Sequence, residues 1–191
     1  MAGWEGADFR LVDPVRAAGV TSPIGPSPYR PASRRFLAPL YVRPEDIREV
    51  AYLTPTERAV IEAARTPVAA SNDDPTRIDR DAVWAAKRVA LDAIFVVPLS
   101  AGRQAELDAF AAREGQPLQD FALWCALEEH YEGAERPAEA WDIDSPLVEA
   151  LRAQLADRVR FHVWLQWICD QQLERAQVSV SSLCIAAAVP T

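Results

Sequence analysis

The segment 21–44 contains six prolines, and this feature constrains the fold more than any other. Proline lacks the backbone N–H that a helix needs and restricts the residue before it, so this segment cannot be helical. Large apolar side chains stand between the prolines: Tyr29, Phe36, Leu37, Leu40 and Tyr41. Because a free tether seldom carries such side chains, we expect an ordered, extended loop that packs on a core.

The sequence beyond this segment has helical periodicity. A helix start is expected at Pro44, and Thr54, Pro55 and Glu57 form the pattern of a capping box. Residues 66–78 contain two prolines and are expected to break the helix. Further helices are expected from Asp79 to Pro98, over 101–113 and 117–132, and from Ser145 onward with a second start at Asp157.

Two short segments are expected to be strands. Residues 7–12 alternate between apolar and polar side chains until Pro14, and residues 178–189 are apolar and carry no charge. The expected order is therefore one strand, a long Pro-rich loop, about five helices and a final strand.

Charge and composition exclude several classes of partner. The chain has 191 residues, 20 of them basic and 28 acidic, which gives a formal net charge of −8. Nucleic acids and anionic membranes both require a positive surface, so neither is expected as a partner. The first 20 residues lack the pattern of a secretion signal, and no apolar run reaches the ~20 residues that span a bilayer. We expect a cytoplasmic protein.

The cysteines and histidines do not form a recognisable metal or nucleophile motif. Cys125, Cys169 and Cys184 have no CxxC or disulfide spacing and are interpreted as structural thiols. His162 lies in a helical apolar stretch and is interpreted as a core histidine, with a catalytic base as the less favoured alternative. We therefore expect no metal and no cofactor.

Acidic residues are plentiful, yet their positions identify no catalytic pair. Glycosidic chemistry requires two carboxylates on opposite sides of one bond. The Asp and Glu residues lie on helix faces or at caps, and no acidic residue follows Glu174.

The Pro-rich segment carries a family resemblance. Residues 27–41 are similar to the S-P-Y-x-x-x-S-R-x-F-x-N-P-x-Y loop of the amylomaltases, which are 4-alpha-glucanotransferases or disproportionating enzymes. Residues 6–14 resemble the G-A-D-x-x-x-x-N-P strand and loop of that family, closest to its actinobacterial branch. The resemblance covers roughly residues 5–177 and extends to three helical motifs, at 79–88, 120–127 and 161–167.

This resemblance implies an α/β fold, specifically a fragment of a (β/α)8 TIM barrel with about two strands and a mostly helical insertion. The barrel strand and sugar-cleft loop would occupy residues 1–44, and the helical insertion residues 45–142. A barrel-type helix would occupy residues 143–177, and residues 178–191 would form an apolar tail in which a strand is expected.

The resemblance also implies an activity and a site. Family members transfer α-1,4-glucan segments in maltodextrin and glycogen metabolism and need no cofactor. Ser27 and Tyr29 are the expected substrate-binding residues, since a Tyr ring offers a flat apolar face to a pyranose and a hydroxyl to its polar edge. The alternative is that Tyr29 packs beneath its own loop.

Departures from the family pattern bear on activity. Asp13 and Ala38 replace two family Asn residues, and Arg16 stands where a His is common. The family's nucleophile, acid/base and transition-state-stabilising carboxylates come from later strands, so no catalytic residue is assigned in this chain. We expect a truncated chain that is inactive alone, self-associates through exposed barrel edges, and leaves Trp84, Trp164 and Trp167 partly exposed. The alternative is a non-catalytic helical interaction module or weak glucan-binding module.

Overall fold

The computed structural model describes residues 9–11, 14–25, 27, 29–73, 78–181 and 186–188. The helices in these ranges are α1 (Pro55–Ala69), α2 (Arg80–Phe95), α3 (Ala101–Glu114), α4 (Gln116–His130), α5 (Pro146–Gln154) and α6 (Ala156–Ser181). The strands are β1 (Phe9–Leu11), β2 (Arg16–Ala17), β3 (Ser33–Leu37) and β4 (Ala186–Ala188). Short 3-10 helices are η1 (Pro39–Tyr41), η2 (Pro44–Asp46), η3 (Arg48–Tyr52), η4 (Ala70–Asp73) and η5 (Ala138–Trp141).

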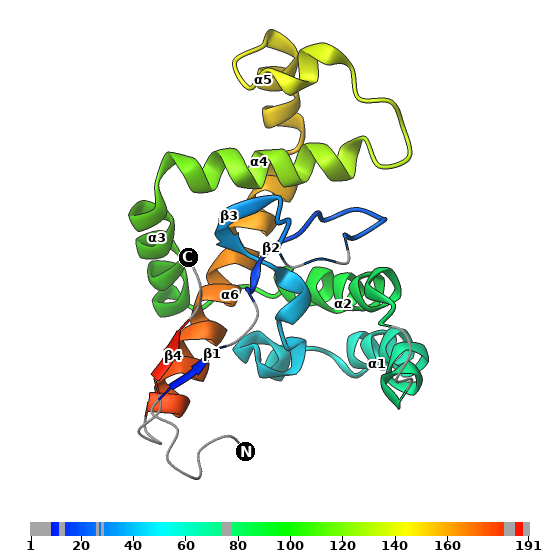
Figure 1. Ribbon diagram of the computed structural model, residues 1–191, viewed down its shortest axis with the longest axis vertical. Coiled ribbons are helices and arrows are strands. Elements are labelled where there is room, and N and C mark those ends of the chain that lie inside the picture. Colours follow the sequence, from blue (N-terminus) through cyan, green and yellow to red (C-terminus); the bar gives the residue numbers. More distant parts are fainter. Residues whose placement is uncertain are drawn as a thin grey trace.

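Helix α6 is the central element: α2, α3, α4 and α5 contact it, and α1 packs on α2 (Figure 1). Helix α4 crosses its N-terminal half, α3 and α2 lie on opposite sides, and β3 packs against its middle. Nine consecutive residues, Phe161–Cys169, are buried. A helix is buried at every successive position only when neighbours cover its whole circumference. The core therefore lies around α6 and not against a sheet.

The three tryptophans that were expected to be partly exposed lie inside this core, so that expectation is wrong. Trp84, Trp164 and Trp167 are 5%, 2% and 2% exposed. The indole Nε1 of Trp84 donates a hydrogen bond to the Val20 carbonyl at 2.7 Å, and the Arg103 guanidinium lies 4.0 Å from the ring centroid of Trp167. Helices of the chain, together with the Pro-rich segment, cover these three side chains.

Local sequence signals explain most helix boundaries. The Thr54 hydroxyl accepts from the Glu57 N–H at 3.3 Å, and the Glu57 carboxylate accepts from the Thr54 N–H at 2.7 Å, so the predicted capping box is confirmed. The predicted break at residue 66 is wrong, because α1 continues to Ala69 with Pro67 inside it. Pro67 lies in the last turn, where its missing N–H removes only one helical bond. Pro44 begins a single 3-10 turn.

The strands form two separate pairs. Strand β1 runs parallel to β4, with Phe9 opposite Ala186, and β2 runs antiparallel to β3, with Arg16 opposite Leu37. The β1–β4 pair lies at the opposite end of α6 from α5 (Figure 1). Helix α6 extends to Ser181, so the apolar tail predicted from residue 178 begins as helix, and its other described residues form the strand β4.

The three predicted segments 1–44, 45–142 and 143–177 contribute to one core. Its buried cluster includes Phe36 from the first segment, Leu91 and Leu123 from the second, and Leu165 from the third. The boundaries at 44, 142 and 177 stay predictions. Across the ranges that the structure describes, none of the helices combines the length and apolarity needed to cross a bilayer.

Candidate functional site

Ser27 and Tyr29 lie together on one exposed turn of the Pro-rich segment. The Ser27 hydroxyl accepts a hydrogen bond from the Tyr29 N–H at 3.3 Å, and the Ser27 carbonyl accepts from the Arg30 N–H at 3.4 Å. The side chain of Tyr29 is 67% exposed, so the alternative that it packs beneath its own loop is wrong. The turn presents the hydroxyl of Ser27 and the ring of Tyr29 on the surface.

A groove of about 390 Å³ runs beside this turn, between the Pro-rich segment and the start of α2. Ser27 lines the groove, whereas Tyr29 does not. The other lining residues are mostly apolar, with two cations, and include no carboxylate among them: Arg16, Ala18, Ile24, Gly25, Pro31, Ala38, Leu40, Tyr41, Ile78, Arg80 and Val83. Such a groove suits a neutral or anionic polar molecule with an apolar face.

The first part of the loop is attached to the N-terminal turn of α2. The Asp81 carboxylate accepts hydrogen bonds from the Ser22 hydroxyl at 3.0 Å and from the Ile24 N–H at 2.8 Å. Three residues further along the helix, Trp84 donates to the Val20 carbonyl. The wall of the groove that precedes the Ser27–Tyr29 turn in the chain is therefore held on α2 by hydrogen bonds.

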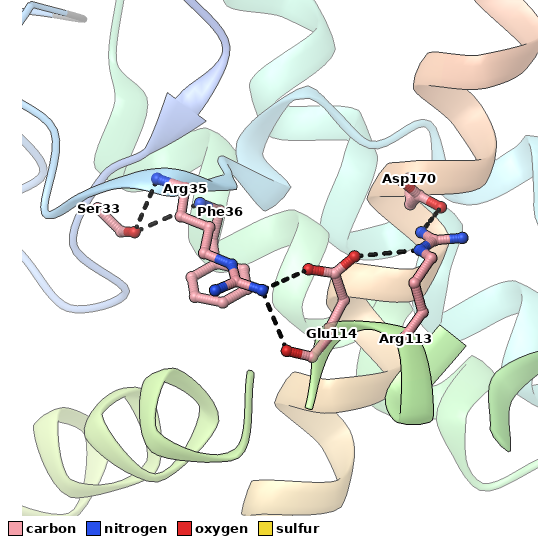
Figure 2. Close-up of polar contacts among 6 residues, drawn as sticks. All are labelled: Ser33, Arg35, Phe36, Arg113, Glu114 and Asp170. Atoms are coloured by element: carbon pink, nitrogen blue, oxygen red, sulfur yellow. Dashed lines mark hydrogen bonds and ion pairs between the residues drawn. The ribbon is translucent and has the colours of Figure 1, made fainter. Parts of the chain in front are cut away.

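The strand β3 fixes the other side of the turn (Figure 2). The Ser33 hydroxyl accepts from the N–H groups of Arg35 and Phe36, at 3.2 and 3.3 Å. The Phe36 ring stacks on Phe121 of α4, with centroids 4.5 Å apart. These are residues of the S-R-x-F motif, so in this chain the motif anchors the loop to the helical core.

A chain of charged side chains connects β3 to α3 and α6 (Figure 2). Arg35 donates to the backbone carbonyl and to the carboxylate of Glu114, at 3.1 and 3.2 Å. Arg113 bridges the Glu114 carboxylate, at 3.1 Å, and the Asp170 carboxylate, at 2.8 Å. Burial acts to raise the pKa of Glu114, but hydrogen bonds from Arg113 and Arg35 outweigh it and lower the pKa below its ordinary value.

Two glutamines of α6 complete the support of the loop. Gln166 accepts from the Leu37 N–H at 3.0 Å and donates to the Leu37 carbonyl at 2.9 Å. Gln172 does the same for Arg43, at 2.9 and 2.8 Å. Each side-chain amide thus supplies the donor and the acceptor that a neighbouring strand would provide.

Lys87 holds the segment that follows β3. Its ammonium donates to the carbonyls of Leu40 and Val42, at 2.5 and 2.8 Å. Burial lowers the pKa of Lys87, and the nearby Glu45 carboxylate offsets part of this effect. Lys87 is the single Lys of the chain, which is the one feature of the sequence that sets it apart.

The positions that depart from the family motif differ in their surroundings. Ala38 is 5% exposed, and its N–H donates to the Val15 carbonyl at 2.9 Å, so a small apolar side chain fills this position. Arg16 lies in β2 and lines the groove. Asp13 lies outside the described residues.

The remaining candidate groups lie in the core. Cys125 and Cys169 are buried, and burial raises the pKa of both thiols, that of Cys169 to about 12, which disfavours a nucleophilic thiolate. Cys184 lies outside the described residues. His162 is 2% exposed and lies 3.3 Å from the Glu129 carboxylate. No cluster of metal-ligating side chains occurs in the ranges that the structure describes.

Comparisons with known proteins show the family of the chain. The family model described as 4-alpha-glucanotransferase matches residues 2–186. A 4-alpha-glucanotransferase from Mycobacterium tuberculosis and one from Mycobacterium bovis are each 45% identical over 184 residues, which cover 92% of this chain and 25% of the relative. The crystal structure of an amylomaltase from Corynebacterium glutamicum matches with a TM-score of 0.79 and 38% identity, over 93% of this chain and 24% of that chain. The chain thus spans about a quarter of the length of these relatives.

Proposed function

Because this chain belongs to the 4-alpha-glucanotransferase family, we propose that it forms the part of such an enzyme that carries a glucan-binding loop and its helical support. The activity to which it contributes is the transfer of α-1,4-glucan segments in maltodextrin and glycogen metabolism. The substrate-binding residues are Ser27 and Tyr29. The observation that carries this proposal is the exposed turn that holds the two side chains together beside the groove.

The chemistry of the turn supports a sugar ligand. The ring of Tyr29 provides a flat apolar surface for the axial C–H groups of a pyranose, and the hydroxyls of Ser27 and Tyr29 suit its polar edge. The prolines near Tyr29 restrict the backbone, so little conformational entropy is lost when a sugar binds. The helices α2, α4 and α6 hold both sides of the loop through Asp81, Phe121 and Gln166.

The same arrangement supports a barrel origin for the strands. Parallel strands require a crossover connection, and β1 and β4 are joined through the whole helical part of the chain. We infer that they belong to a (β/α)8 barrel whose other strands pair with their open edges. Open strand edges recruit other chains, so the 191 residues alone are expected to self-associate. A monomer in sedimentation velocity across a tenfold concentration range would contradict this inference.

The lining of the groove beside Ser27 bears on the transfer step. Retaining glycosyl transfer needs a carboxylate nucleophile and a carboxylic acid about 5 Å apart, and no carboxylate lines this groove among the described residues. We therefore propose that these residues bind glucan and that the transfer step needs carboxylates from elsewhere in the enzyme. The family match favours this function over the alternative of a helical interaction module.

Two measurements test the proposed function. The purified chain should show saturation transfer to maltoheptaose, and Tyr29→Ala should weaken this signal while Arg30→Ala, a neighbouring exposed substitution, leaves it unchanged. The same preparation should release no glucose from maltotriose above a protein-free control. An unaltered signal in Tyr29→Ala would exclude the loop as the binding element, and glucose release that a point substitution abolishes would overturn the proposal on transfer.

A further inference from the structure

A second exposed aromatic ring lies in the segment between α4 and α5. Trp141 ends η5, and its side chain is 64% exposed, although a tryptophan is among the costliest residues to leave in water. The guanidinium of Arg136 lies over the ring, 4.0 Å from its centroid. Because this cation covers one face of the indole, the exposed area comes from the opposite face and the edges.

The cation behind the ring is itself fixed. Arg136 donates to the Glu128 carboxylate at 2.6 Å and, through Nε and Nη2, to the Ala140 carbonyl at 3.2 and 2.7 Å. Its side chain is only 9% exposed. Trp141 is therefore backed by a guanidinium that hydrogen bonds hold in place, and its ring loses little further freedom when a ligand stacks on it.

Acidic residues flank Trp141 in the chain, together with Ile143, an exposed apolar residue. Glu139, Asp142 and Asp144 are exposed, and the Asp142 carboxylate also accepts from the Asp144 N–H at 3.1 Å, which fixes the turn after the ring. Carboxylates accept hydrogen bonds from hydroxyl groups. A flat apolar ring on a segment that also carries exposed carboxylates matches a sugar ring with its hydroxyl rim, whereas a stable protein interface needs about 800 Å² of surface on each partner.

We propose that Trp141 is a surface stacking site for a pyranose ring of an α-1,4-glucan, separate from the Ser27–Tyr29 turn. The proposal rests on the proposed function for the identity of the sugar. The segment between α4 and α5 lies at the opposite end of α6 from β1 and β4 (Figure 1). Strands that pair with β1 or β4 in the whole enzyme would therefore lie at the other end of α6, away from Trp141. Two separate contacts on one glucan chain raise the local concentration of that chain at the loop.

The test uses the indole N–H resonances of the chain in two-dimensional NMR during titration with maltoheptaose. The resonance of Trp141, assigned from its loss in Trp141→Phe, should shift on titration. Trp141→Ala should raise the Kd for maltoheptaose about tenfold, the change that ~1.4 kcal/mol of lost stacking produces. Trp141→Phe should retain part of it. Tyr52→Ala removes an aromatic side chain that is 75% exposed and serves as the matched control, which should change nothing.

The outcomes separate this proposal from the proposed function. A Trp141 resonance that does not move, or equal binding by Trp141→Ala and the native chain, overturns the stacking site whatever Tyr29→Ala does. A Trp141 shift that persists in Tyr29→Ala supports the stacking site, even if Tyr29→Ala shows that the loop does not bind glucan. Arg136→Lys keeps the charge but loses the planar contact and the paired bonds to the Ala140 carbonyl, so it should weaken binding and lower the thermal midpoint while the far-UV spectrum stays native.

Discussion

The core around α6 and the Pro-rich segment are held by different interactions. In the core, apolar side chains such as Phe161, Trp164 and Leu165 are removed from water on every side. In the Pro-rich segment, side chains of the helices bond backbone groups, as Gln166 bonds Leu37 and Lys87 bonds the carbonyls of Leu40 and Val42. The first kind of interaction scales with buried area, and the second depends on the position of individual atoms.

This difference indicates how the chain separates stability from binding. The regular elements in the described part of the Pro-rich segment, β3 and η1, are short, so many of its N–H and C=O groups need partners from elsewhere. The helices supply them, and the turn that carries Ser27 and Tyr29 is left exposed. Substitutions in the core should therefore change the free energy of unfolding strongly, whereas those under the loop should change local order with a smaller global effect.

The largest effect is expected from Trp164→Ala. The substitution removes a side chain that is 2% exposed and packs on Phe95 and Phe161, and cavities of this kind cost about 3–5 kcal/mol. Denaturant unfolding followed by far-UV circular dichroism measures the change.

The control for this prediction is Val60→Ala on α1, a helix without a buried residue. Val60 is 51% exposed, so its truncation should stay within about 0.5 kcal/mol of the native chain. Similar losses for the two variants would contradict the description of α6 as the centre of the core.

The next effect is a loss of stability in acid that depends on Glu129. Its carboxylate accepts from Arg158 at 2.7 and 2.9 Å and lies beside His162. Burial acts to raise the pKa of Glu129, but His162 and Arg158 lower it from 4.5 to about 2. Because the folded pKa is the lower one, this stability is complete above pH ~4.5 and is lost as the pH falls toward 2. The loss amounts to about 3 kcal/mol.

Chemical denaturation at pH 6, 4 and 3, for the native chain and Glu129→Gln, isolates this contribution. Other carboxylates with lowered pKa values, such as Glu114, titrate in both proteins, so the difference between the two curves belongs to Glu129. The native chain should lose more stability than the variant across this range. Parallel curves would show that Glu129 is not the group responsible.

Sequence patterns predicted local structure better than its assembly. The capping box at Thr54 and Glu57 and the helix starts at Asp79 and Ser145 follow from short-range rules and are confirmed. The burial of Trp84, Trp164 and Trp167 could not be predicted, because it depends on which helices cover α6. The family motif pointed to the loop that carries Ser27 and Tyr29. It did not predict that Ser27 lines the groove whereas Tyr29 does not.

The residues that support the loop are harder to predict from the sequence. Gln166 is a polar residue inside the apolar run Phe161–Cys169, which indicates a specific partner without naming it. The Arg35–Glu114 contact joins residues 79 positions apart, and a single sequence contains no information on such a pair. Contacts of this kind are set by tertiary packing, whereas caps and turns are set by neighbours in the chain.

An intermediate effect is expected from Gln166→Leu. The substitution preserves the volume of the side chain but leaves the N–H and C=O of Leu37 without these partners inside the protein. Removing a partner of buried polar groups costs about 1–3 kcal/mol. Hydrogen exchange should show faster exchange of the Leu37 amide than of amides in α4. Gln172→Leu, on the more exposed turn of α6 that holds Arg43, is the matched control and should cost less.

The smallest effect on stability is expected from the contact between Arg35 and Glu114. The two side chains are 50% and 22% exposed, and exposed ion pairs contribute about 0.2–1 kcal/mol because water screens them. A double-mutant cycle with Arg35→Met and Glu114→Gln, measured by thermal unfolding, should give a coupling energy in this range that falls as salt is added. Arg35 also bonds the backbone carbonyl of Glu114, so Arg35→Met should cost slightly more than Glu114→Gln. A coupling energy above ~2 kcal/mol would mean that the charged chain from β3 to α6 stabilises the protein as much as a buried hydrogen bond does. The core and the Pro-rich segment would then differ less in how strongly they are held than we propose.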